Sequence, residues 1–111
     1  MKSFDRDKAL AIVDGDEQLL GEIIDLFRKQ NLKLLAEMER AIRTAEPGLL
    51  RRAAHTLKGA ASNVAAKQIC ESAGRLETMA AQGNLQDAAA EFQRLKADLE
   101  QIDQELAEST W

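Results

Sequence analysis

The last part of the sequence carries the apolar pattern that most constrains the fold. The pattern consists of Leu85, Ala88, Phe92, Leu95, Leu99, Ile102 and Leu106. Steps of three and four residues alternate without interruption, so all of these side chains fall on one side of a helix. A seam this regular is typical of a helix that packs against neighbouring helices in a bundle.

The rest of the sequence favours helix as well. Proline occurs once and tyrosine is absent, while Ala, Leu, Glu, Lys and Gln are frequent. Turn-forming residues around 14–16, 46–48 and 83–84 divide the chain. We therefore expect an all-α fold, an antiparallel, up-down four-helix bundle with a short extra N-terminal helix. The predicted helices cover residues 4–13, 17–45, 47–64, 66–82 and 85–106.

Length and composition exclude several classes of protein. The 111 residues suit one domain, residues 1–111, and the net charge of −4 argues against nucleic-acid binding. No apolar run approaches the roughly 18–20 residues of a membrane span, and the N-terminus lacks the apolar core of a signal peptide. Cys70 has no partner for an internal disulfide, and one cysteine with one histidine cannot form a zinc site. We expect a cytoplasmic protein that binds neither metal nor membrane.

The one histidine, His55, lies in the segment R-A-A-H-T-L-K-G-A-A-S-N-V-A-A, residues 52–66. The apolar residues of this predicted helix lie within roughly 60° of Leu50 around its axis. The other side carries Lys58 at roughly 80°, Ser62 at about 120°, His55 at about 140° and Gly59 at about 180°. His55 is therefore predicted to face away from the core. An exposed histidine and lysine are also compatible with an ordinary solvated surface.

Gly59 makes the segment more than an ordinary surface. Glycine inside a helix costs roughly 1 kcal/mol relative to alanine, and its missing side chain leaves space beside the imidazole. A neutral imidazole can attack a phosphoryl group, and a nearby ammonium can offset the phosphoryl charge. Histidine, lysine and glycine at this spacing are thus the minimum set for a transient phosphohistidine.

The residues His55-Thr56-Leu57-Lys58-Gly59 resemble the H-x-L-K-G motif of histidine-containing phosphotransfer (HPt) domains. The N-terminal segment, with Phe4-Asp5 and Gly15-Asp16-Glu17, is similar to the family's usual lead-in. The resemblance implies a phosphorelay intermediate in two-component signal transduction. Such a domain carries a phosphoryl group between the aspartates of receiver domains and is not an enzyme with its own ATP site.

The resemblance also implies roles for individual residues. His55 would accept the phosphoryl group on Nε2, and Lys58 would stabilise the phosphoryl oxygens. Gly59 would let the partner's active site close over the ring, and Ser62 would line the same docking face.

Two further residues are assigned with an alternative left open. In the family, a Gln or Glu of the next helix often bonds the imidazole Nδ1, and register places Glu77 there; otherwise Glu77 is a surface carboxylate. Arg51 would meet the acidic receiver, or is simply solvated. One departure concerns Ala65, because many members have glycine at that position, so the end of this helix is not determined.

The expected partners are receiver domains and an upstream hybrid histidine kinase. No cofactor of its own is implied, since the receiver would supply Mg²⁺. We expect a monomer, either a whole protein or the cytoplasmic C-terminal part of a membrane-bound sensor kinase. The alternatives are a helical adaptor without phosphotransfer, a hydrolase with His55 as general base, and a kinase dimerisation segment.

Overall fold

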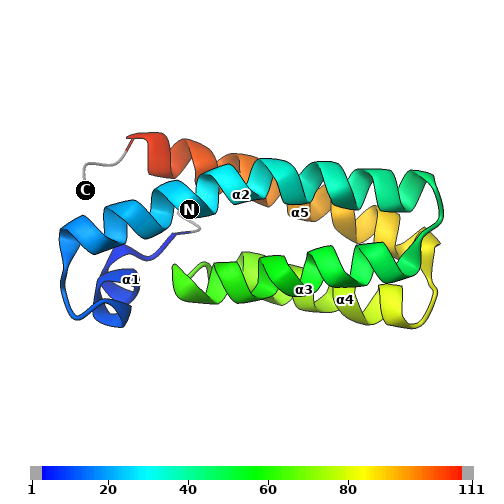
Figure 1. The fold of residues 1–111 in the computed structure, drawn as a ribbon, viewed down its shortest axis with the longest axis horizontal. Helices are drawn as coiled ribbons and strands as arrows, with labels where there is room; N and C mark the ends of the chain where they lie inside the picture. The colour runs from blue at the N-terminus through cyan, green and yellow to red at the C-terminus, as the bar shows by residue number, and fades with distance from the viewer. Residues whose placement is uncertain (1–3, 109–111) are drawn as a thin grey trace.

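Five helices follow one another through residues 4–108, the part of the chain that the computed structural model describes. Helices α2 and α4 each pack against both α3 and α5, and α1 lies against α2 (Figure 1). The predicted all-α bundle with a short N-terminal helix is therefore confirmed, and the described residues contain no strand. Within the same residues, no helix combines the length and hydropathy needed to cross a membrane. The elements are α1 (Arg6–Ile12), α2 (Glu17–Arg43), α3 (Pro47–Asn63), α4 (Lys67–Ala81) and α5 (Leu85–Glu108).

The helices begin at residues suited to that position. The side chains of Asp5, Asp16 and Asn84 each accept a hydrogen bond from the backbone N–H three residues further on, at 3.1, 3.0 and 3.2 Å. These bonds satisfy N–H groups that have no partner within the first helical turn. Pro47 occupies the first position of α3, where its missing N–H is not needed. The expected breaks before α2, α3 and α5 are confirmed.

Ala65 resolves where α3 ends. The helix stops at Asn63, Val64 caps it, and Ala65 adopts a φ of 55°, in the left-handed region. The Ala66 N–H then donates to the Ala61 carbonyl at 2.9 Å, as in a helix end that normally uses glycine. Alanine therefore adopts the glycine conformation here, at a strain of about 1 kcal/mol.

Helices α3 and α4 make the most extensive contact in the bundle. Both helices carry several small buried residues, which suits a close approach of their backbones. Leu57 and Leu76 are fully buried members of the same core. This close approach places the outer flanks of α3 and α4 within reach of each other. The small buried residues are Ala53, Ala54 and Ala61 on α3 and Ser72, Ala73 and Ala80 on α4.

The seam of α5 is buried from Ala88 to Leu106, as predicted. Glu91 was not predicted from the sequence; its side chain lies beside this seam and is only 2% exposed. Its carboxylate accepts hydrogen bonds from Ser72 Oγ at 2.8 Å and Arg75 Nε at 2.9 Å. Burial is the largest single influence on Glu91 and would raise its pKa, but the hydrogen bonds from Arg75 and Ser72, together with the positive charges of Arg75 and Arg94, outweigh it and hold the pKa below its ordinary value. Glu91 therefore joins α4 to α5 as an ionised group.

Candidate phosphoacceptor site

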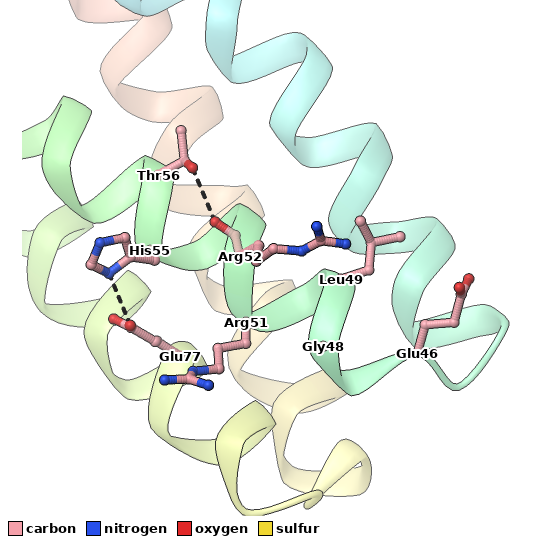
Figure 2. A pocket seen from close by; sticks show the side chains of 8 residues that line it. All are labelled: Glu46, Gly48, Leu49, Arg51, Arg52, His55, Thr56 and Glu77. Carbon is pink, nitrogen blue, oxygen red and sulfur yellow. Dashed lines mark hydrogen bonds and ion pairs between the residues drawn. The ribbon is translucent and has the colours of Figure 1, made fainter.

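His55 lies in the middle of α3 on the flank that faces α4. Its side chain is 68% exposed, and the ring stands outward from the core, as the helical spacing predicts (Figure 2). Nδ1 lies 2.9 Å from Oε2 of Glu77 on α4. The ring is therefore held on one side by the protein and open to solvent on the other.

Glu77 determines which ring nitrogen carries the proton. The hydrogen bond from Lys58 is the largest cause that lowers the pKa of Glu77; partial burial opposes it, and the His55 hydrogen bond adds to the lowering. The carboxylate is thus ionised at neutral pH and can only accept hydrogen bonds. Nδ1 of His55 must then donate to it, and in the neutral imidazole this leaves the lone pair on Nε2.

Lys58 uses the other oxygen of the same carboxylate. Its Nζ donates to Oε1 of Glu77 at 2.8 Å, and the Lys58 side chain is 39% exposed. A single glutamate, itself 18% exposed, therefore holds both the imidazole and the ammonium. The ammonium is therefore held on the same carboxylate that engages Nδ1 of the ring.

Gly59 and Ser62 lie in different surroundings. A Cβ atom built on Gly59 would meet nothing within 4 Å, so the described residues leave open space there. Ser62 is exposed, but its Oγ donates to the Lys58 carbonyl at 3.1 Å and lies 3.3 Å from Cys70 Sγ. The Ser62 hydroxyl is thus engaged with its own helix and with α4, whereas the space over Gly59 is free for a visiting group.

Arg51 lies one turn before His55 and lines a surface hollow together with His55 and Glu77. In Figure 2 its side chain extends on the Glu77 side of α3, whereas Arg52 extends toward Leu49. Both arginines are exposed. A positive group is therefore present beside His55 and Glu77.

Gly74 on α4 is a further residue of this site that was not predicted from the sequence. A Cβ atom built there would lie 3.6 Å from Cδ of Lys58. The signal was available, because glycine inside a predicted helix is the same feature that singled out Gly59. What the sequence could not supply was the path of the Lys58 side chain.

No group of three or more His, Cys, Asp or Glu side chains within residues 4–108 is arranged to hold a metal ion. The site instead presents a tautomerically fixed imidazole with an exposed nucleophilic nitrogen. A carboxylate lies behind the ring and a cation lies beside it. This is the arrangement of a side chain that takes up a group from a visiting partner.

Comparison with known proteins agrees with a side chain that takes up a transferred group. The sequence model of the Hpt domain family matches residues 22–105, and the chain therefore belongs to the Hpt domain family. Its fold is similar to the crystal structure of histidine-containing phosphotransfer protein B (HptB) from Pseudomonas aeruginosa PAO1. The TM-score is 0.85 at 22% identity, over 97% of each chain. No curated protein sequence matches the chain.

Membership in this family indicates the general role of the chain. Hpt domains carry phosphoryl groups in the phosphorelays of two-component signalling and interact there with receiver domains and kinases. They are phosphoryl carriers rather than enzymes with an ATP site of their own.

Proposed function

We propose that His55 is the residue of this chain that is phosphorylated, on Nε2, by the aspartyl phosphate of a receiver domain, and that it then passes the group to a second receiver. The observation that carries this proposal is the 2.9 Å contact between Nδ1 and Glu77 on an outward-facing ring. It supports Nε2 as the nucleophile, because the other nitrogen is engaged.

The transfer balances without an added acid or base. The Nε2 lone pair forms the N–P bond while the P–O bond of the aspartyl phosphate breaks, and the electron pair leaves with the receiver's carboxylate. Nδ1 keeps its proton throughout, so the phosphorylated ring becomes cationic and Glu77 lies ready to compensate that charge. The return transfer reverses these steps, and Glu77 therefore serves both directions.

Lys58 supports the same step from the side. Its ammonium, held 2.8 Å from Glu77, lies close enough to the ring to move onto the phosphoryl oxygens after docking. Mg²⁺ for the reaction would come from the receiver, whose carboxylates suit that ion. His55 and Lys58 thus provide an aligned nucleophile and one counter-charge.

We infer that the receiver docks over Arg51, Gly59 and Ser62 and extends onto an apolar hollow between α2 and α3. Leu26 of α2 and Ala60 of α3 line this hollow, and Leu26 is 65% exposed. Ala60 directly follows Gly59, so one partner that covers Gly59 also reaches the hollow. Ile12, which is 51% exposed, lines the same hollow, and a contiguous exposed apolar patch marks a protein–protein interface more often than a single exposed leucine does.

A hybrid histidine kinase would supply the first phosphoryl group through its own receiver domain. The sequence contains no Gly-rich phosphate loop and no nucleotide-binding fingerprint, which supports a partner as the source. We propose that the carrier acts as a monomer in the cytoplasm, where both receivers can reach the His55 face in turn.

The direct test is incubation with a receiver domain that has been phosphorylated on its aspartate. Wild-type protein should gain phosphate that is labile in acid and stable in alkali, and His55→Gln should gain none. Equal labelling of both proteins would reject His55 as the acceptor. Binding of the receiver without any labelling of the wild type would favour the adaptor function instead.

A further inference from the structure

The Lys58 side chain reaches Glu77 by crossing α4 at Gly74. A Cβ atom placed on Gly74 would lie 3.6 Å from Lys58 Cδ, and this is the one heavy-atom neighbour within 4 Å among the described residues, apart from the local helix backbone. Gly74 precedes Glu77 by three residues and so lies about one turn away on the same side of α4. The aliphatic part of Lys58 therefore rests over bare backbone, and its ammonium then meets Oε1 of Glu77.

Core packing does not account for this glycine. Gly74 lies in the interior of α4, has no positive φ and would not place a Cβ against any core side chain. Glycine is also a poor helix former, so alanine would be the better residue for α4 alone. The contact that remains is the one with Lys58.

We propose that Gly74 is a positioning residue for phosphotransfer at His55, because its missing side chain provides the path along which Lys58 lies on α4 and holds its ammonium beside the imidazole. The proposal rests on the phosphoacceptor function of His55. A lysine that is already laid along a surface loses less side-chain freedom when it engages a phosphoryl group than one that moves freely in solvent.

The geometry sets the size limit at this position. A methyl group at 3.6 Å from Cδ is in ordinary van der Waals contact, so Gly74→Ala should leave Lys58 in place. Atoms beyond Cβ would occupy the path of the lysine side chain. Gly74→Val should therefore displace the ammonium from Glu77, and Gly74→Ala is its matched control.

The first measurement is an NMR titration of the Glu77 carboxyl in the unphosphorylated protein. The hydrogen bond from Lys58 is the main cause that lowers the pKa of this group, so Gly74→Val should raise the pKa toward that found in Lys58→Ala. Gly74→Ala should titrate like the wild type. A wild-type titration in Gly74→Val would overturn the proposal, whatever the outcome for phosphotransfer.

The second measurement is the rate of phosphotransfer from a phosphorylated receiver, in a double-mutant cycle with Lys58→Ala. Gly74→Val should reduce the rate about tenfold in the wild-type background and leave it unchanged when Lys58 is already alanine. An equal loss in both backgrounds would show an effect that does not pass through Lys58 and would reject the proposal. If Gly74→Val does not fold by circular dichroism, Gly74→Leu replaces it, since leucine favours helix and fills the same path.

The two measurements separate this inference from the proposed function. If wild-type protein accepts no phosphate, the assignment of His55 fails, while the Glu77 titration still decides whether Gly74 positions Lys58.

Discussion

Glu77 and Glu91 each hold two side chains together, and they differ in how far water reaches them. Glu91 is 2% exposed and joins Ser72 and Arg75 within the α4–α5 contact. Glu77 is 18% exposed and joins His55 and Lys58 on the outer flank of the α3–α4 contact.

This difference in exposure suggests that Glu91 contributes mainly to the stability of the fold and Glu77 mainly to phosphotransfer. When a buried carboxylate or one of its partners is removed, the remaining buried polar group has no hydrogen-bond partner and no water to replace it. This strongly destabilises the fold. A carboxylate near the surface contributes little to stability, because water replaces its partners. It can still fix the geometry of a reactive group. We therefore expect mutations at Glu91 to change the free energy of unfolding and mutations at Glu77 to change the rate of phosphotransfer.

The largest expected effect is on stability at Glu91. Glu91→Ala leaves the buried Ser72 hydroxyl without its acceptor and opens space beside the α5 seam, so the free energy of unfolding should fall by about 3 kcal/mol. Chemical denaturation measures this change. The folded fraction should still accept phosphate at a rate close to that of the wild type. A stable variant with slow phosphotransfer would contradict the division between the two glutamates.

The opposite pattern is expected at Glu77. Glu77→Ala releases the imidazole and the ammonium together, and the phosphotransfer rate should fall about 100-fold, as when a fixed catalytic contact is removed. The free energy of unfolding should change by less than about 1 kcal/mol. Stopped-flow transfer from a phosphorylated receiver provides the rate.

Glu77→Gln is the matched control for charge. Its amide oxygen can still accept from Nδ1 of His55, so the ring remains oriented while the counter-charge for the phosphorylated ring is lost. The loss of rate should be smaller than in Glu77→Ala. Rates that are equal in the two variants would show that orientation of the ring is not what Glu77 contributes.

The dependence of stability on pH should also distinguish the two sites. Both carboxyls have a pKa below the reference value of 4.5. A depressed pKa stabilises the fold above the unfolded value, and that stabilisation is lost as pH falls through the folded pKa. The partners of Glu91 are shielded from water, whereas water competes with those of Glu77. Glu91→Gln should therefore flatten the fall in unfolding free energy below about pH 4.5 more than Glu77→Gln does. Urea unfolding at pH 7 and at several lower pH values measures the slopes, and equal slopes would count against the comparison.

Much of this architecture can be predicted because the signals are local. Turn residues mark the breaks between helices, and the spacing of apolar residues shows which side of each helix faces the core. The same spacing points His55 outward. The assignment of Glu77 came from the resemblance to HPt domains, in which a Gln or Glu of the next helix often bonds the imidazole.

The parts that escaped prediction depend on contacts between helices. Glu91 looks like a surface glutamate until Ser72 and Arg75 of α4 are placed beside it. Gly74 has no evident role until the path of Lys58 is known. Ser62 was assigned to the docking face, and the hydrogen bond from its hydroxyl to the Lys58 carbonyl was not foreseen. A side chain's partner on another helix is not encoded in its own periodicity.

The smallest expected effect concerns Ala65, outside both carboxylate sites. Glycine adopts its φ of 55° without strain, so Ala65→Gly should raise the free energy of unfolding by about 0.5–1 kcal/mol. Phosphotransfer should not change, because the turn leaves His55 and Glu77 in place. Thermal unfolding measures the gain, and a lower melting temperature would show that the turn is not strained.

The most direct test of the account is to identify the phosphorylated nitrogen of His55. Phosphorus NMR with nitrogen-15-labelled protein, after transfer from a phosphorylated receiver, distinguishes the two ring positions. We predict phosphate on Nε2 with Nδ1 still protonated toward Glu77. Phosphate on Nδ1, or on any residue other than His55, would contradict it.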